Sequence, residues 1–169
     1  QVHPVPNAAL QATPFTQQFP NATVNFANNS AAGAWTYLWN LDDGTTFNTQ
    51  TITAHTYSTW GTYQVSLIVS SAICSDTAIQ EVVILPPLPT ANFIGSGEGC
   101  VPLTVDFTNT SWQGLTYLWQ FGDGSTSSAD DPIYTFNVPG TYTVTLTAYG
   151  QGGMTSLATK VDSVIVHPK

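Results

Sequence analysis

The feature that most restricts how this 169-residue chain can fold is an internal repeat. The run Tyr37-Leu38-Trp39 returns about 80 residues further on as Tyr117-Leu118-Trp119. Further runs match in the same order: Val24-Asn25-Phe26 with Val105-Asp106-Phe107, Leu41-Asp42-Asp43-Gly44 with Phe121-Gly122-Asp123-Gly124, and Gly61-Thr62-Tyr63 with Gly140-Thr141-Tyr142. Because a unit of this length can close a modest core of its own, the repeat predicts two tandem domains.

Apolar and polar residues alternate within each unit at a period of two, which is typical of β-strands with one buried face. Tyr63, Val65, Leu67 and Val69 are expected to face one side of such a strand. No segment shows a comparable helical stripe. About seven short strands per unit, separated by Asp-Gly turns, predict an all-β chain: two tandem antiparallel sandwiches of the immunoglobulin-like kind.

Four aromatic residues are expected to form the structural core of the two units. Trp39 and Trp119 fall where immunoglobulin-like sandwiches place a core tryptophan, and Tyr63 and Tyr142 fall where they place a corner tyrosine. Antibody domains carry a cysteine two residues after that tyrosine, whereas both units have valine there. Packing around the two indoles must therefore replace the disulfide between the sheets.

Three runs of the second unit form one pattern: Trp119-Gln120-Phe121-Gly122-Asp123-Gly124, Tyr134-Thr135-Phe136 and Pro139-Gly140-Thr141-Tyr142. Because of this pattern, the chain resembles the PKD (polycystic kidney disease) domain family. The first unit is a variant that has Leu41-Asp42-Asp43-Gly44 in place of Phe-Gly-Asp-Gly but keeps His55-Thr56-Tyr57. The resemblance covers roughly residues 14 to 167 and implies modules of a secreted or cell-surface protein of bacteria, with a protein of the Bacteroidetes type as one alternative.

The segment Leu85-Pro86-Pro87-Leu88-Pro89-Thr90 is short and rich in proline, so it is expected to join the units as a stiff spacer. We assign residues 1–13 to an N-terminal linker or edge segment, residues 14–87 to a first, divergent domain, and residues 88–169 to a second domain. The pair is expected to be a monomeric rod.

The charge balance excludes two classes of partner. Two basic residues, Lys160 and Lys169, stand against ten acidic ones, and the formal net charge is −8. Such a chain cannot build the cationic surface that binds nucleic acid or anionic lipid. No apolar run approaches the roughly 20 residues that span a bilayer, so membrane insertion is not expected.

The sequence also lacks the motifs of an enzyme: it has no Gly-x-Ser-x-Gly elbow, no His-Glu-x-x-His and no phosphate-binding glycine loop. His3 and His167 lie in terminal segments, and His55 takes the position that Tyr134 holds in the other unit. A position that accepts either His or Tyr is interpreted as a half-buried packing site. We therefore predict no catalytic residues.

Five aspartates are the weak candidates for a calcium site: Asp42, Asp43, Asp123, Asp130 and Asp131. Aspartates in tight turns commonly cap backbone amides, which is the simpler interpretation of those beside the glycines. The resemblance implies calcium binding through an acidic residue directly after the tryptophan, but Asn40 and Gln120 stand there. No cofactor is expected, and weak calcium binding is the alternative.

Three further tryptophans, Trp35, Trp60 and Trp112, are candidate ligand-contact residues because carbohydrate-binding modules present exposed rings to sugars. Packing under a loop or between domains is the alternative interpretation.

Neither Cys74 nor Cys100 has a counterpart in its own unit. Two unpaired thiols are expected, with an interdomain bridge as the alternative.

Several short motifs match glycosylation acceptors. Asn21, Asn28 and Asn109 begin Asn-x-Ser/Thr triplets, for which turn and strand chemistry is the alternative interpretation. Asp76-Thr77-Ala78 and Asp162-Ser163-Val164 resemble the O-glycosylation acceptor of Bacteroidetes.

Two functions fit these observations. The first is a non-catalytic structural or adhesive module that spaces or presents other domains of the same polypeptide, or binds a glycan or an extracellular protein. The alternative is a substrate-binding accessory module of a secreted hydrolase such as a chitinase, collagenase or other protease. Both imply an extracellular or cell-surface location.

Overall fold

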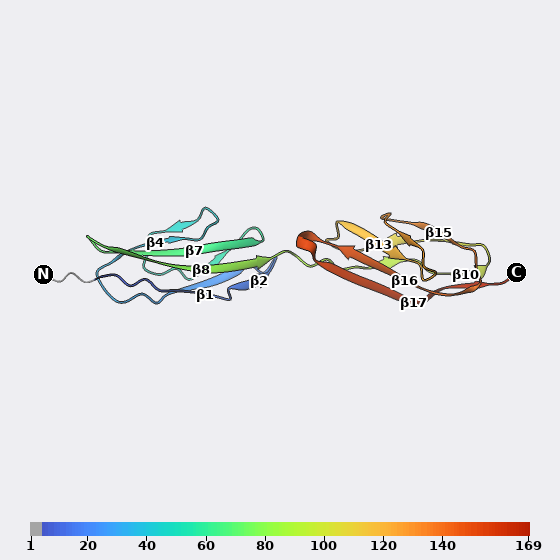
Figure 1. The fold of residues 1–169 in the computed structure, drawn as a ribbon, viewed down its shortest axis with the longest axis horizontal. Coiled ribbons are helices and arrows are strands. Elements are labelled where there is room, and N and C mark those ends of the chain that lie inside the picture. Colours follow the sequence, from blue (N-terminus) through green and yellow to red (C-terminus); the bar gives the residue numbers. More distant parts are fainter. Residues whose placement is uncertain (1–4) are drawn as a thin grey trace. The chain divides into compact units, whose positions relative to one another are not determined.

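A computed structural model describes residues 5–169 of the chain. The chain folds into two compact units, of which the first ends at Pro86 and the second begins at Pro87 (Figure 1). The division falls in the proline-rich segment, one residue before the boundary assigned from the sequence. We call the units the first and the second module.

The first module consists of two sheets with strand orders β1-β3-β6 and β2-β8-β7-β4-β5. Its strands are β1 (Leu10–Thr13), β2 (Thr16–Gln18), β3 (Thr23–Asn28), β4 (Thr36–Asn40), β5 (Thr46–Phe47), β6 (Ala54–Thr56), β7 (Gly61–Ser70) and β8 (Ser75–Leu85). The chain passes from one sheet to the other between β1 and β2, where β2 pairs parallel with β8. Residues 10–13, which the sequence left open as linker or edge segment, are thus an edge strand.

The second module repeats this arrangement with the strand order β10-β17-β16-β13-β14 in its larger sheet and the pairs β9-β12 and β11-β15 opposite. Its strands are β9 (Phe93–Ile94), β10 (Gly97–Cys100), β11 (Leu103–Asp106), β12 (Thr108–Asn109), β13 (Thr116–Gln120), β14 (Thr126–Ser127), β15 (Ile133–Phe136), β16 (Gly140–Tyr149) and β17 (Thr155–His167). β10 pairs parallel with β17, as β2 does with β8.

The prediction of an all-β chain with two sandwich modules is confirmed. Apart from one 3₁₀ turn at Gln151–Gly153, the regular elements of residues 5–169 are strands. More strands appear than the seven expected per unit because the first strand of each module divides between the two sheets. In the second module the next strand also breaks at the buried Phe107. No helix in the described part is long and apolar enough to cross a membrane.

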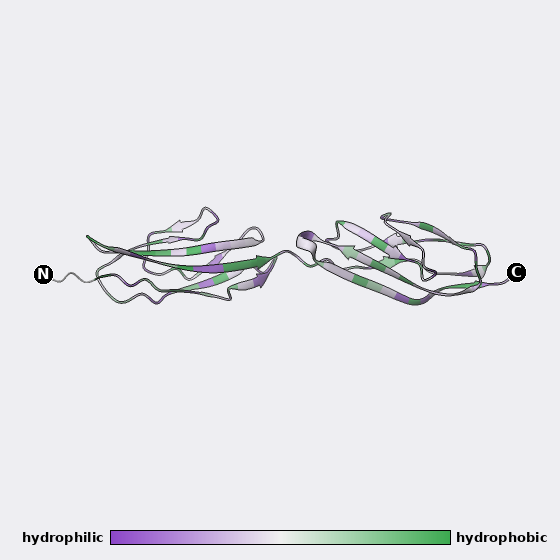
Figure 2. Cartoon of the chain, viewed as in Figure 1, coloured by the Kyte–Doolittle hydropathy of each residue, from purple (hydrophilic) through white to green (hydrophobic). Residues whose placement is uncertain are grey.

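The alternating pattern produces the buried face as predicted. Along β7 the side chains of Tyr63, Val65, Leu67 and Val69 are buried, whereas their neighbours in between face outwards. Figure 2 shows the same alternation of apolar and polar bands along β16 and β17. Because successive side chains of a strand point to opposite faces, this pattern covers one face of each sheet and leaves the other to solvent.

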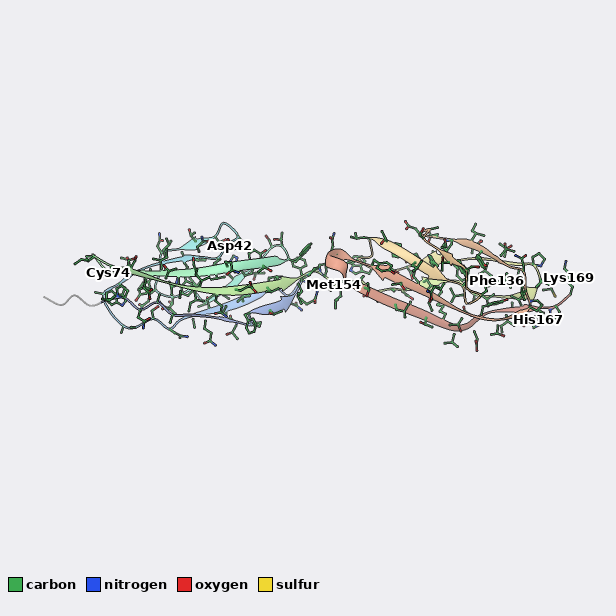
Figure 3. All side chains as sticks on the ribbon, in the orientation of Figure 1. Asp42, Cys74, Phe136, Met154, His167 and Lys169 are labelled. Atoms are coloured by element: carbon green, nitrogen blue, oxygen red, sulfur yellow. The ribbon has the colours of Figure 1, made fainter. Side chains whose placement is uncertain are left out.

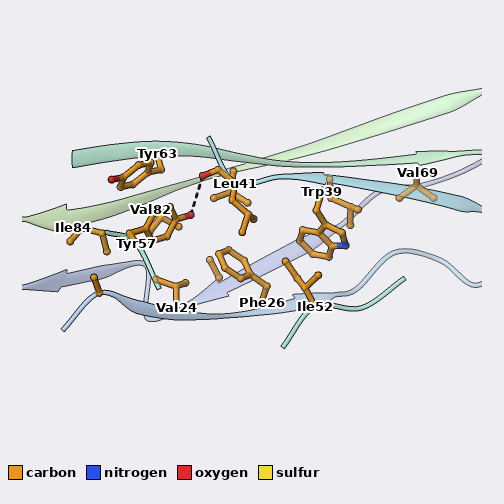
Figure 4. Packing of buried hydrophobic residues seen from close by; sticks show 14 residues of the cluster. Val24, Phe26, Trp39, Leu41, Ile52, Tyr57, Tyr63, Val69, Val82 and Ile84 are labelled. Carbon is orange, nitrogen blue, oxygen red and sulfur yellow. Dashed lines mark hydrogen bonds between the residues drawn. The ribbon is translucent and has the colours of Figure 1, made fainter. Parts of the chain in front are cut away.

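Each core is built around one fully buried indole. Trp39 and Trp119 have no exposed surface. In the first module Phe26 meets Trp39 edge-on with ring centroids 6.1 Å apart, and Ile52 packs beside them (Figure 4). A buried indole N–H needs an acceptor. The Trp39 Nε1 donates to the Thr49 carbonyl oxygen at 3.2 Å, and the Trp119 Nε1 donates to the Ala129 carbonyl oxygen at 2.9 Å.

The two predicted corner tyrosines form hydrogen bonds with the backbone just before β7 and β16. The Tyr63 hydroxyl donates to the Thr59 carbonyl oxygen at 2.9 Å, and the Tyr142 hydroxyl donates to that of Val138 at 2.7 Å. Tyr63 is buried and Tyr142 is half-buried. In both modules the tyrosine bonds four residues upstream, which is the geometry of the tyrosine corner in immunoglobulin-like folds.

A third core tyrosine, Tyr57, was not singled out from the sequence. Its ring stacks on that of Tyr63 with centroids 4.0 Å apart, and its hydroxyl donates to the Leu41 carbonyl oxygen at 3.2 Å (Figure 4). Burial of the phenol is the main cause that raises the pKa of Tyr57.

Replacing the central indole should cost the second module much of its stability. Trp119→Ala removes a fully buried ring, which costs about 3–5 kcal/mol in comparable cores. Urea unfolding followed by hydrogen exchange of each module should show loss of protection in residues 87–169 alone. Leu157→Ala is the control because Leu157 is 63% exposed on the outer face. Equal effects of the two substitutions would contradict this account of the core.

Candidate functional site

The Asp-Gly turns join β4 to β5 and β13 to β14, and an aspartate closes each turn. The Asp43 Oδ1 accepts a hydrogen bond from the Thr45 N at 3.0 Å, and the Asp123 Oδ1 accepts one from the Ser125 N at 2.9 Å. This is the backbone-capping role expected for aspartate in a tight turn.

The second carboxylate oxygen of each turn aspartate contacts a side chain of the opposite sheet. The His55 Nε2, on β6, lies 2.6 Å from the Asp43 Oδ2, and the Tyr134 hydroxyl, on β15, donates to the Asp123 Oδ2 at 2.7 Å. The sequence treated His55 as a packing position and missed this partner. An alignment of the two repeats would have revealed the pair. In each repeat a side chain that can donate a hydrogen bond, His55 or Tyr134, follows the turn aspartate at nearly the same spacing in the sequence.

These contacts stabilise the ionised form of both turn carboxylates. Partial burial raises the pKa of Asp43, but hydrogen bonds with His55 and Thr45 outweigh it and hold the pKa below its ordinary value of 3.8. Partial burial likewise raises the pKa of Asp123, and hydrogen bonds with Tyr134 and Ser125 lower it below that value. Both aspartates therefore remain charged at neutral pH.

Two of the remaining calcium candidates accept hydrogen bonds from backbone amides. The Asp42 Oδ2 accepts from the Gln64 N at 2.8 Å, and the Asp131 Oδ1 accepts from the Asn109 N at 2.7 Å. Asp130 is exposed. Within residues 5–169 no group of three or more His, Cys, Asp or Glu side chains is placed to hold a metal ion. Within each module the candidate aspartates thus form no such group.

A shallow hollow lies beside the turn of the second module. Its lining is uncharged and comes from the two strands and the turn between them: Gln120, Gly122, Gly124, Ser125 and Thr126. The amide of Gln120 stands directly after the core tryptophan, and its Oε1 accepts from the Thr145 hydroxyl at 3.4 Å.

The three candidate surface tryptophans differ in exposure. Trp35 packs against the first core, and its Nε1 donates to the Ala31 carbonyl oxygen at 2.9 Å. Trp60 is 44% exposed and Trp112 is 69% exposed. Because Trp112 is held by backbone hydrogen bonds to Thr90 in both directions, its ring is presented on a fixed segment. It is the most exposed of the three.

Cys74 and Cys100 are both exposed and form no disulfide. Cys74 directly precedes β8, next to the turn that follows β7 (Figure 3). The exposed His167 contacts Glu98, with Nε2 and Oε1 3.0 Å apart. His3 lies outside the described residues.

Two of the three Asn-x-Ser/Thr triplets serve as local anchors. The Asn28 Oδ1 accepts from the Ser30 N at 3.0 Å, and the Asn109 Oδ1 accepts from the Ser111 N at 2.9 Å. Each serine hydroxyl in turn accepts a hydrogen bond from a backbone amide just before the first strand of its module. The Ser30 Oγ accepts from the Ala9 N at 3.0 Å, and the Ser111 Oγ accepts from the Asn92 N at 3.1 Å. The triplets have a turn role in both modules.

The fold defines a class: tandem immunoglobulin-like sandwich modules. The family comparison agrees with this class. The model of the PKD domain family matches residues 1–84 and again residues 87–166, so the chain belongs to the PKD domain family.

Individual similar proteins include two bacterial enzymes. The chain is 29% identical over 85 residues to a microbial collagenase of Vibrio alginolyticus, a match covering 47% of this chain and 10% of that protein. It is 45% identical over 42 residues to Collagenase ColA of Bacillus cereus, covering 25% of this chain and 4% of that protein. The chain therefore spans a small fraction of the curated relatives that it matches.

Solved structures similar to the chain include the PKD1 domain of the Vibrio cholerae metalloprotease PrtV. That match has 34% identity and a TM-score of 0.41, and it covers 46% of this chain and 98% of that one. The titin domains Z1Z2 match over the full length of both chains with a TM-score of 0.50 and 14% identity, a likeness of fold alone.

The turn of the second module should tolerate no side chain at Gly122. A Cβ there would lie 2.6 Å from the Thr143 carbonyl oxygen, and φ is +86°. Gly124 is the matched control: φ is +92°, but nothing lies within 4 Å of its Cβ position. Gly124→Ala should cost about 1–2 kcal/mol for the left-handed conformation alone, and Gly122→Ala clearly more. Chemical denaturation measures both, and equal costs would argue against the clash.

Acid should lower the free energy of unfolding by protonating the turn aspartates Asp43 and Asp123. Their folded pKa values lie below 3.8, so their stabilisation is complete above that value and is lost as the pH falls through the folded pKa. Asp123→Asn should therefore flatten the fall of the unfolding midpoint as the pH drops below about 4, measured by calorimetry. Asp130→Asn is the control for removal of an exposed charge, and identical slopes in both variants would count against the assignment.

Proposed function

We propose that this chain is a non-catalytic accessory region of a secreted bacterial protease of the collagenase kind. The observation that carries the proposal is the sequence match of its PKD domains to two bacterial collagenases. The two matched segments are both PKD domains, which are non-catalytic. The catalytic activity would therefore lie in another part of the polypeptide.

An accessory function requires a surface that holds substrate near a catalytic domain. Exposed aromatic rings on a rigid support are suited to this, because they bury a large area and lose little conformational entropy. Trp112 meets this description best, with Trp60 as a second, less exposed ring. The net charge of −8 favours protein ligands that carry basic residues over acidic polymers.

This proposal reverses the order of the two functions inferred from the sequence. The similarity to enzymes supports the accessory function more than the purely structural or adhesive one. An extracellular location follows from it, since collagen and comparable insoluble substrates lie outside the cell. Other domains of the same polypeptide and an extracellular protein or glycan would be the partners.

Binding to insoluble substrates tests the proposal. The chain should be retained on insoluble collagen, and Trp112→Ala should weaken binding by about tenfold if the ring acts as an anchor. Ile133→Ala, which removes another exposed apolar side chain, is the matched control and should bind as the unmodified chain does. Chitin and cellulose serve as parallel matrices. Absence of retention on all three would leave the structural spacer as the better account.

A further inference from the structure

In both modules a turn aspartate forms a hydrogen bond with a side chain of the opposite sheet at the same place in the fold, but the partner side chain differs. Asp43 with His55, and Asp123 with Tyr134, connect a turn of the larger sheet to a strand of the smaller one. We propose that these two pairs, which we call the cross-sheet clasps, close the rim of each sandwich directly, so that neither module depends on calcium for its stability.

The side chains of the clasp in the first module are partly shielded from solvent. The side chains of His55 and Asp43 are only 16% and 17% exposed. The imidazole also meets the Tyr57 ring edge-on, with centroids 4.9 Å apart. Tyr57 in turn bonds the Leu41 carbonyl oxygen next to the turn, so two hydrogen bonds join the same turn to the opposite side of the module. Hydrogen bonds to an ionised carboxylate are stronger than neutral ones, and more so where solvent is partly excluded.

The clasp of the second module uses a phenol in place of the imidazole. The Tyr134 ring stacks on the Phe121 ring with centroids 4.0 Å apart and planes at 5°. Phe121 is buried directly before the turn, so stacking on it holds the Tyr134 ring in a fixed position beside the turn. Its hydroxyl then reaches the Asp123 carboxylate and lies 2.9 Å from the Ser125 Oγ. Two different side chains thus make the same contact with the turn aspartate of their module.

Calcium does not fit this arrangement. It takes six to eight oxygen ligands, including carboxylates, at about 2.3–2.6 Å. Here both oxygens of Asp43 and of Asp123 are already engaged by a backbone amide and by the clasp. The residue after each core tryptophan is an amide: the Asn40 Oδ1 accepts from the Asp42 N at 2.9 Å. Within residues 5–169 no three His, Cys, Asp or Glu side chains lie together, so the charged ligands that calcium takes are not assembled at either turn.

Exchange of the two clasp residues gives a direct experiment on the full chain. Tyr134→Phe keeps the stacked ring and removes the hydroxyl, and it should lower the unfolding midpoint of the second module by about 5 °C. Tyr134→His supplies the partner of the first module and should recover part of that loss. His55→Phe and His55→Tyr are the corresponding pair in the first module. Calorimetry gives the midpoints, and hydrogen exchange assigns each transition to a module.

Calcium is tested on the unmodified chain, so the result does not depend on a variant that folds. Unfolding midpoints in millimolar calcium chloride and in excess EGTA should agree within about 1 °C, since a ligand that binds only the folded state raises the midpoint. A higher midpoint in calcium, or heat of calcium binding by titration calorimetry, would overturn calcium independence. An unchanged midpoint in Tyr134→Phe and His55→Phe would overturn the clasps.

Discussion

Burying one indole in each module without leaving its N–H unpaired is the constraint on which both cores depend. The ring of Trp39 or Trp119 fills the space between the sheets, and its nitrogen must find an acceptor inside the module. In each case the acceptor is a backbone carbonyl, of Thr49 or Ala129, in the segment that leads from one sheet to the other. The indole therefore determines the path of that crossover as well as the packing of the core.

Polar contacts close the modules where apolar packing ends. The corner tyrosine fastens the start of β7 or β16, the serine of the Asn-x-Ser triplet anchors the first strand, and the clasp joins the turn to the opposite sheet. Each of these occurs in both modules. A chain with only 7% charged residues and no disulfide is thus closed mainly by neutral and single-carboxylate hydrogen bonds.

Much of the fold could be predicted because its signals are local. The alternation along β7 and the matched runs around Trp39 and Trp119 led to the sandwich class and the two domains. The division of the first strand between two sheets was missed, because a strand that changes partners has no distinct periodicity. His55 shows the same limit for the site, since its environment fitted a packing role until the structure placed it beside Asp43. The sequence analysis placed the structural or adhesive function first, whereas the similarity to collagenases favours the accessory function. The fold could not decide between them, because a sandwich fold serves many functions.

The sequence by itself determined the β-strand periodicity and the turn positions, which depend on neighbours within a few residues. It also determined the repeat and, through it, the two core tryptophans, because comparison of the chain with itself reveals them. Only the tertiary structure decided which oxygen meets which donor. The spacing of the turn carboxylates along the chain does not reveal that they meet side chains of the opposite sheet. The outcome depends on how two sheets approach each other, which is a property of the packed core and not of any local pattern.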